Sequence, residues 1–205
     1  MRAPLFLIIS LCLLFANCSN KFHPIRVSGY VKKEARKYEK NGWLVFSGAL
    51  PIEQQLNDSY LKQREKVDKN PKWIVANGSA IGETLGACEM QANEIALISL
   101  SSALGTEMRK IANTDLINDQ LSKEEVVSIS KTITVATNKV AKKIEASTTL
   151  FKIYKENKKN YEVQVQIAYN YNNAIKLLLQ EIKNNLENNK NIIDKLDKIN
   201  VSLNL

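Results

Sequence analysis

Cysteine and histidine are the residues from which chemistry is first expected in this 205-residue chain, which has three of the former and one of the latter. The cysteines, Cys12, Cys18 and Cys88, do not cluster, so no zinc site built from Cys and His is predicted. His23 precedes Pro24 in a polar segment and is interpreted as a linker residue. Serine and threonine nucleophiles lack a histidine base, and a Ser-Lys arrangement stays open only because both residue types are abundant. We therefore predict no catalytic residue, no metal site and no cofactor.

The N-terminus surrounds Cys18 with a pattern that indicates modification of its thiol. Arg2 precedes Leu5–Phe15, an apolar run that is shorter than the roughly 20 residues of a membrane-spanning helix but typical of a secretory signal. The run ends in Phe15-Ala16-Asn17-Cys18, which resembles the lipobox of bacterial lipoproteins in a relaxed form like that of spirochaetes and Bacteroidetes. Phe15 and Asn17 stand where the commonest lipobox has Leu and Gly or Ala.

This resemblance implies that residues 1–17 are a lipoprotein signal peptide and that Cys18 is lipidated on its thiol and on its new amine. Two or more acyl chains make membrane attachment stable where a single chain would be marginal. The implied location is the bacterial cell envelope, and Ser19 favours the outer membrane by similarity to the enterobacterial sorting rule. The periplasmic face and the cell surface both stay open. An ordinary cleaved signal with an incidental cysteine, or an uncleaved signal anchor, is the alternative.

The mature chain is basic. The whole sequence has a net charge of +8, and loss of Arg2 with the signal peptide lowers it to +7. Residues 18–41 are polar and predict a lipidated N-terminus and tether. Its basic cluster either adds about 1 kcal/mol per residue at an anionic membrane surface or forms a solvated short helix. The cluster consists of Lys32, Lys33, Arg36, Lys37 and Lys40. Cys88, the one thiol left unmodified, is predicted to be a buried structural residue.

Hydrophobic periodicity divides the remainder into a single α+β domain, residues 42–188, and an Asn- and Lys-rich tail, residues 189–205, that is helical or frayed. Apolar runs predict a strand or packed loop at 43–46 and a strand at 73–76 that Asn77-Gly78 stops. Helices are predicted over 52–69, over 83–112 as a buried central helix, from the capping box Ser122–Glu125 onward, and after a cap at Asn172 or Asn173.

Strict alternation of apolar and polar residues predicts a strand over 161–169. Residues 143–154 precede it across the polar link 155–160, so the two segments form a hairpin. The strand has Tyr161, Val163, Val165, Ile167 and Tyr169 on one face and Glu162, Gln164 and Gln166 on the other. The predicted fold class is therefore α+β: a small antiparallel sheet with one wet face, packed by two or three long helices, with a C-terminal helix.

The order of these elements carries a second resemblance. Pro71–Ala80 runs into a helix with regularly spaced alanines, followed by another helix and the late hairpin. Over about residues 71–180 this order is similar to the twenty-kilodalton outer-membrane lipoprotein family of Helicobacter type and to the N-terminal domain of a flagellar-assembly T protein. The resemblance implies an α+β domain in the periplasm or on the cell surface without enzymatic activity. This resemblance implies no functional residue in the present chain. The predicted lipidation of Cys18 depends on the lipobox alone.

Three functions follow, in this order of preference. The first is a membrane-anchored lipoprotein with a non-catalytic structural or interaction role in the bacterial envelope, and with an envelope or host protein as partner. The second is a surface-exposed, adhesin-like binder of a host or polyanionic ligand. Interleaved acidic residues favour a solvated basic face over a polyanion groove, so a nucleic-acid partner is not expected. The third, an enzyme, lacks any supporting motif.

Overall fold

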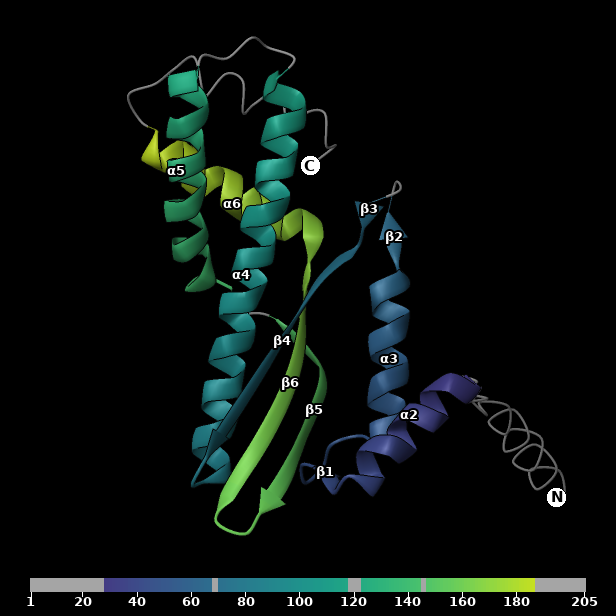
Figure 1. Ribbon diagram of the computed structural model, residues 1–205. Coiled ribbons are helices and arrows are strands. Elements are labelled where there is room, and N and C mark those ends of the chain that lie inside the picture. Colours follow the sequence, from purple (N-terminus) through teal and green to yellow (C-terminus); the bar gives the residue numbers. More distant parts are fainter. Residues whose placement is uncertain (1–27, 68–69, 118–122, 145–146, 187–205) are drawn as a thin grey trace, which may run out of the picture.

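A four-stranded antiparallel sheet in the order β1–β5–β6–β4 is the centre of the fold (Figure 1). The computed structural model describes residues 28–67, 70–117, 123–144 and 147–186. The strands of the sheet are β1 (Trp43–Val45), β4 (Trp73–Gly82), β5 (Thr148–Asn157) and β6 (Asn160–Asn170). A separate pair, β2 (Lys66–Val67) and β3 (Asn70–Pro71), precedes β4. The α+β fold class and the late hairpin are confirmed.

The alternation along β6 separates two differently covered faces of the sheet. Val163, Val165 and Ile167 are buried in the main core under α4 (Leu85–Ile117). On the opposite face, α2 (Gly29–Lys40) and α3 (Ile52–Arg64) pack over β1 and β5 (Figure 1). Because α2 and α3 leave the β4–β6 half of that face partly open, the polar residues of β6 there are only half-buried. The predicted wet face is thus confined to this half.

Helix α4 is the long buried helix that the sequence predicts. Its buried residues recur every four positions, so they form a stripe that winds gradually around the helix. They are Cys88, Ala92, Ala96, Leu100, Leu104 and Met108. Beyond the sheet, α4 packs against α5 (Lys123–Ala141) and α6 (Tyr171–Asn185) (Figure 1). The prediction of a buried structural thiol is confirmed, since Cys88 is 1% exposed and its Sγ lies 3.3 Å from the carbonyl oxygen of Tyr161.

Strand β4 does not stop at Asn77-Gly78 as predicted but continues to Gly82. The reason for the glycine is a contact with another element of the fold. A Cβ on Gly78 would lie 1.9 Å from the carbonyl oxygen of Ala92 and 2.5 Å from the amide nitrogen of Ala96. Glycine is therefore required because the backbone of α4 lies directly on the strand, and it does not mark a turn.

The prediction of a tether over 18–41 is wrong from residue 29 onward, because α2 belongs to the folded domain. Ser28 caps this helix, its Oγ accepting a hydrogen bond from the amide of Val31 at 3.3 Å. Val31 and Ala35 are buried against a second hydrophobic cluster that includes Trp43, Leu56 and Phe151. Two small apolar residues four positions apart were sufficient to pack a helix that is otherwise strongly charged.

Several element boundaries also differ from prediction. Helix α3 ends at Arg64, and the pair β2–β3 follows it. The hairpin turn is Lys158-Lys159, since both strands extend into the predicted link. The cap of α6 is Asn170, whose side chain accepts from the amide of Asn173 at 3.0 Å. The predicted cap Ser122, the tail 189–205, the signal peptide, Cys18 and His23 lie outside the described residues.

Candidate functional site

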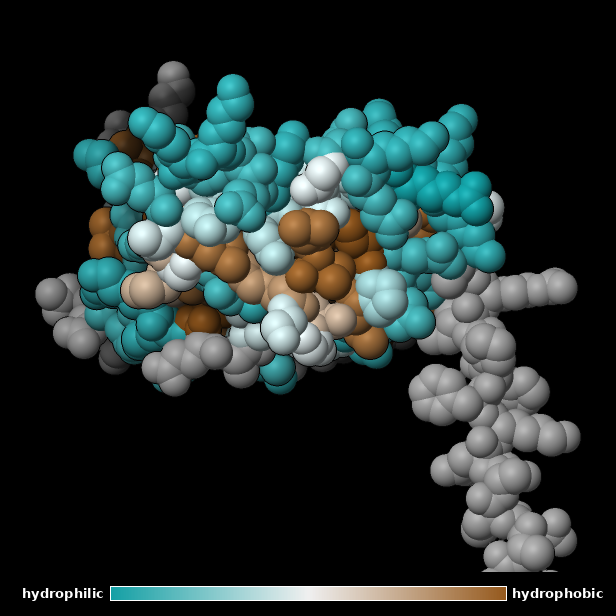
Figure 2. Space-filling model, turned by 90° about the horizontal axis from the view of Figure 1, so that it is seen from below, coloured by the Kyte–Doolittle hydropathy of each residue, from teal (hydrophilic) through white to brown (hydrophobic). Residues whose placement is uncertain are grey.

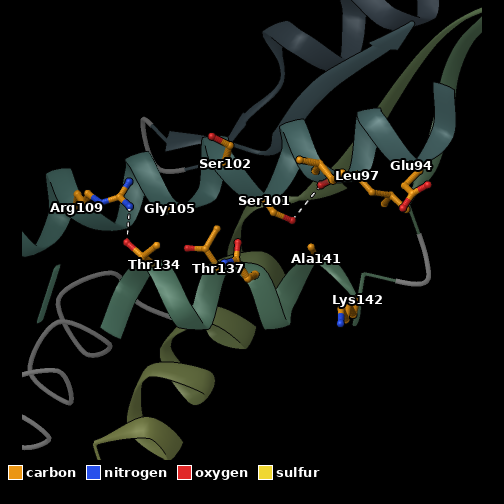
Figure 3. Close-up of a pocket in the computed structure, with 12 residues that line it drawn as sticks. Glu94, Leu97, Ser101, Ser102, Gly105, Arg109, Thr134, Thr137, Ala141 and Lys142 are labelled. Carbon is orange, nitrogen blue, oxygen red and sulfur yellow. Dashed lines mark hydrogen bonds between the residues drawn. The ribbon is translucent and has the colours of Figure 1, made fainter. Parts of the chain in front are cut away.

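A groove of about 700 Å³ lies between α4 and α5 (Figure 3). Figure 3 shows Ser101 and Gly105 on α4 opposite Thr134 and Thr137 on α5, with Arg109 towards one end. The helices come close at Gly105, where a Cβ would lie 2.8 Å from Thr137 Oγ1. The groove is therefore a gap between two helices that a glycine brings together.

Three hydroxyl groups of this groove already donate hydrogen bonds within the protein. Ser101 donates to the carbonyl oxygen of Leu97 at 3.0 Å, and Thr137 donates to that of Ile133 at 2.6 Å. Thr134 likewise donates to a carbonyl oxygen four residues back and accepts from Arg109 Nη2 at 3.0 Å. The hydroxyl groups of Ser101, Thr134 and Thr137 therefore have no free donor for a ligand.

Another candidate surface is apolar. Figure 2 views the end of the molecule that is at the bottom of Figure 1 and shows an apolar area bordered by hydrophilic side chains. Two exposed apolar residues, Leu44 of β1 and Ile81 at the end of β4, belong to elements that reach this end. Such an area can pack against a partner, but apolar contact alone does not identify the chemistry of that partner.

A polar cleft of about 460 Å³ lies on the open half of the sheet, with α2 and α3 as its walls. Its volume is within the usual range of small-ligand sites. The lining comes from the following residues: Glu34 and Tyr38 of α2; Leu56, Ser59, Tyr60 and Gln63 of α3; Asn77, Gly78 and Ser79 of β4; Phe151 of β5; and Gln164, Val165 and Gln166 of β6. We refer to it as the polar cleft.

A chain of side-chain hydrogen bonds joins the wall of the polar cleft to its floor. Gln63 Nε2 donates to Ser59 Oγ at 2.9 Å, and Ser59, which is buried, donates in turn to Gln166 Oε1. Gln166 Nε2 then donates to Asn77 Oδ1 at 2.8 Å. These bonds hold α3 against β6 and β4 and fix the orientation of both amides, so the polar groups of the cleft are preorganised.

Two other polar side chains of the cleft have no hydrogen-bond partner in the part of the chain that the structure describes. The side chains of Ser79 and Gln164 make no hydrogen bond to any described residue. Gln164 lies on the same face of β6 as Gln166 and is half-buried. A half-buried amide has two N–H donors and an acceptor oxygen, and here all of them are available to a ligand.

The wall formed by α2 adds a carboxylate and aromatic rings. Tyr60 donates its hydroxyl hydrogen bond to Glu34 Oε2 at 2.6 Å. This hydrogen bond, with burial as a smaller cause, raises the pKa of Tyr60 well above the usual range of tyrosine. Burial, reinforced by the charge of Glu34, also raises the pKa of Tyr38. Tyr38 lies 5.4 Å from Phe151 between ring centroids, so two aromatic rings meet beside the carboxylate.

The charge of the polar cleft selects among ligand types. No lysine, arginine or histidine is among the described residues that line it, whereas Glu34 supplies a carboxylate. An anionic ligand would meet a like charge without a compensating cation. The cleft therefore suits a neutral or cationic ligand rich in hydrogen-bonding groups.

Cys88, the one described residue among the cysteines and the histidine that the sequence singled out, does not line this cleft. Cys18 and His23 are outside the described residues, and Cys88 is in the core. The alternation of β6 had placed Gln164 and Gln166 on the polar face, but nothing in the sequence indicated that α2 and α3 would wall it.

Two further results concern the described ranges alone. They contain no cluster of three or more Asp, Glu, His or Cys side chains suited to a metal ion. None of their helices has the length and hydropathy that crossing a membrane requires. No protein-family model, curated protein or solved structure matches this chain.

Proposed function

We propose that this chain is a lipid-anchored, non-catalytic binding protein of the bacterial cell envelope, and that its polar cleft holds a neutral glycan fragment. The observation that carries the proposal is the lining of the cleft, in which amides, hydroxyls, aromatic rings and one carboxylate occur without a cation. Cys18 supplies the proposed attachment to the membrane.

The match to a glycan follows from hydrogen-bonding capacity. A sugar hydroxyl both donates and accepts, so it is best bound by groups that do the same or that complement each other at short range. Amides such as Gln164 provide donors and acceptors together, and the carboxylate of Glu34 accepts from hydroxyls. The aromatic rings of Tyr38 and Phe151 give an apolar surface for the C–H face of a sugar ring.

The binding experiment uses soluble oligomers of N-acetylglucosamine and of glucose as probes, with isothermal titration calorimetry. We expect at least one oligomer to bind and Gln164→Leu to weaken it about threefold to tenfold, the value of one hydrogen bond. The matched control is Gln91→Leu on α4, an exposed glutamine that does not line the cleft and whose loss should change nothing. Absence of binding, or equal affinity of the Gln164 variant, contradicts a glycan-binding cleft.

The anchor is tested separately by metabolic labelling with palmitate. We expect Cys18→Ala to abolish the label and to release the protein from the membrane fraction. Cys12→Ala, inside the apolar run of the signal, is the matched control and should label normally. A Cys18→Ala protein that still takes up palmitate would remove the lipid anchor from the proposal and leave the cleft untouched.

A further inference from the structure

Helix α2 presents a continuous basic face to solvent. At 100° per residue its five cationic positions fall within an arc of about 140°. All five side chains are exposed, and none makes an ion pair or hydrogen bond to another described residue. They are Lys32, Lys33, Arg36, Lys37 and Lys40, and we refer to them as the basic face of α2.

The orientation of this face is set by packing. Val31 and Ala35 are 3% and 2% exposed and hold the opposite side of α2 against the second hydrophobic cluster. Glu34 lines a cavity together with Lys33 and Lys37, but its carboxylate accepts the hydrogen bond of Tyr60 and forms no ion pair with a described lysine or arginine. Glu39 is the one acidic residue at the border of the arc. The rigid helix therefore holds a local excess of positive charge outward, where a tether would have dispersed it.

The border of the basic face carries an aromatic residue. Tyr30 is 66% exposed, and its ring lies 5.8 Å from that of Tyr60, centroid to centroid, in an edge-on arrangement. Tyrosine is enriched at membrane interfaces because its ring is apolar and its hydroxyl group is polar. Exposed cations bordered by such a ring favour an anionic membrane surface as the partner. A cavity of about 420 Å³ beside Tyr30, Lys33 and Lys37 leaves room there for a headgroup.

The position of α2 in the chain brings it to such a surface. Gly29, its first residue, is only eleven positions after Cys18. An extended segment of that length spans at most about 40 Å, so the anchor proposed above keeps the helix near the bilayer. The attraction acts over a Debye length of about 8 Å at physiological salt, so docking requires direct approach of the helix to the headgroups.

We propose that the basic face of α2 docks the folded domain onto anionic phospholipid headgroups and so orients it at the membrane. Headgroup phosphates pair with the outward-facing cations, and Tyr30 enters the interface beside them. This proposal rests on the proposed lipid anchor in one respect only: the anchor brings the domain to the membrane. The contact itself needs no acyl chain, so it is testable without one.

The experiment uses residues 18–205 with Cys18→Ala, which keeps every described residue but cannot be acylated. Co-sedimentation is measured with vesicles of phosphatidylcholine alone and of phosphatidylcholine with about 30% phosphatidylglycerol, which supplies the negative surface. We expect binding to the anionic vesicles only, and its loss at about 0.5 M salt, where charges are screened.

Substitution of the basic face gives the decisive comparison. Lys33→Gln, Arg36→Gln and Lys37→Gln together remove three exposed cations and keep residues that favour helices. At about fivefold per charge, vesicle binding should weaken roughly a hundredfold. The matched control substitutes Lys142, Lys158 and Lys159, which are exposed on other elements, by glutamine and should bind as before. Circular dichroism verifies that both variants keep their helix content.

Three outcomes would overturn the docking. The first is equal binding to neutral and anionic vesicles, and the second is equal weakening by both sets of substitutions. The third is retention on heparin at physiological salt without any vesicle binding, which would assign the basic face to a soluble polyanion. Because the chain tested has no acyl chain, failure here leaves the palmitate result unaffected, and loss of palmitate labelling leaves the vesicle result unaffected.

Discussion

Replacement of Gly78 by alanine tests the contact on which the main core depends. The added Cβ would lie 1.9 Å from the carbonyl oxygen of Ala92 and 2.5 Å from the amide nitrogen of Ala96. Both atoms belong to the backbone of α4, so no side-chain rotation relieves the overlap. The helix would have to withdraw from β4 by more than about 1 Å, which opens contacts along the whole buried stripe.

The expected cost follows from overpacking. Forced insertion into a packed core costs about 1–3 kcal/mol, and backbone atoms on the receiving side place this site at or above the upper value. For a chain of this size, about 3 kcal/mol lowers the melting temperature by roughly 6–12 °C. The opposite sign is expected at an unhindered strand glycine, because alanine reduces the entropy of the unfolded chain. The sign and the size of the change in the free energy of unfolding therefore both report on the contact between α4 and β4.

The assay is thermal and urea unfolding followed by circular dichroism at 222 nm, a wavelength that reports helix content. Gly86→Ala is the matched control: Gly86 also belongs to α4, and an added Cβ there meets nothing within 4 Å. Its stability should stay level or rise by up to about 1 kcal/mol, since alanine favours helices over glycine. If Gly78→Ala unfolds at the same temperature as Gly86→Ala, α4 does not lie on β4 as described.

Three further predictions concern single contacts. Because the pKa of Tyr60 is raised, the folded protein should lose stability as the pH rises above about 10, where tyrosine ionises in the unfolded chain. Glu34→Gln removes the carboxylate and should bring the phenolate absorbance transition of Tyr60 at 295 nm back towards that pH. An unchanged transition would contradict the hydrogen bond between Tyr60 and Glu34. The indole of Trp73 donates to Glu65 at 2.8 Å, and this bond, with Lys72, lowers the pKa of Glu65. The contact is therefore present above the ordinary pKa of glutamate and lost as the pH falls through the lower folded-state value. Trp73 fluorescence, read in a chain whose other tryptophan is replaced by phenylalanine, should change with a midpoint below that ordinary value. Asn170→Ala should cost about 1 kcal/mol in urea unfolding, since the cap of α6 is lost; no change in the midpoint would show that the cap contributes nothing.

The sequence predicted those parts of the fold that local patterns determine. Alternation over 161–169 identified β6 and its polar face, and regular apolar spacing identified α4. Gly78 was misread because a glycine after asparagine is typical of a turn. Glycine is needed at this position because the backbone of α4, more than ten residues away in the sequence, lies against it. A short helix at the basic cluster was one of two alternatives, but its packing into the domain was missed because its buried set is small and five cations surround it.

The polar cleft could be predicted only in part, because its walls are held in place by contacts between residues that are far apart in the sequence. Ser59 and Gln166 are hydrogen-bonded across 107 positions of sequence, and Glu34 meets Tyr60 from a different helix. Alternation can assign Gln166 to a face, but it contains no information on which helix covers that face. The β6 part of the floor was therefore predictable, whereas the β4 part at Asn77 to Ser79 and the walls from α2 and α3 were not.

Helix α2 is common to both proposed surfaces, and its geometry predicts that they act independently. Glu34 and Tyr38, four positions apart, line the cleft, whereas the basic face is centred on another side of the same helix, with Lys33 and Lys37 at the border next to them. A bilayer that holds the cations need not move the carboxylate or the ring, because packing of Val31 and Ala35 fixes the helix between them. The triple lysine and arginine variant should therefore bind the glucose or N-acetylglucosamine oligomer with unchanged affinity, and Gln164→Leu should bind anionic vesicles as the parent does. If either change weakens the other interaction, α2 shifts on docking and the two surfaces form one coupled site.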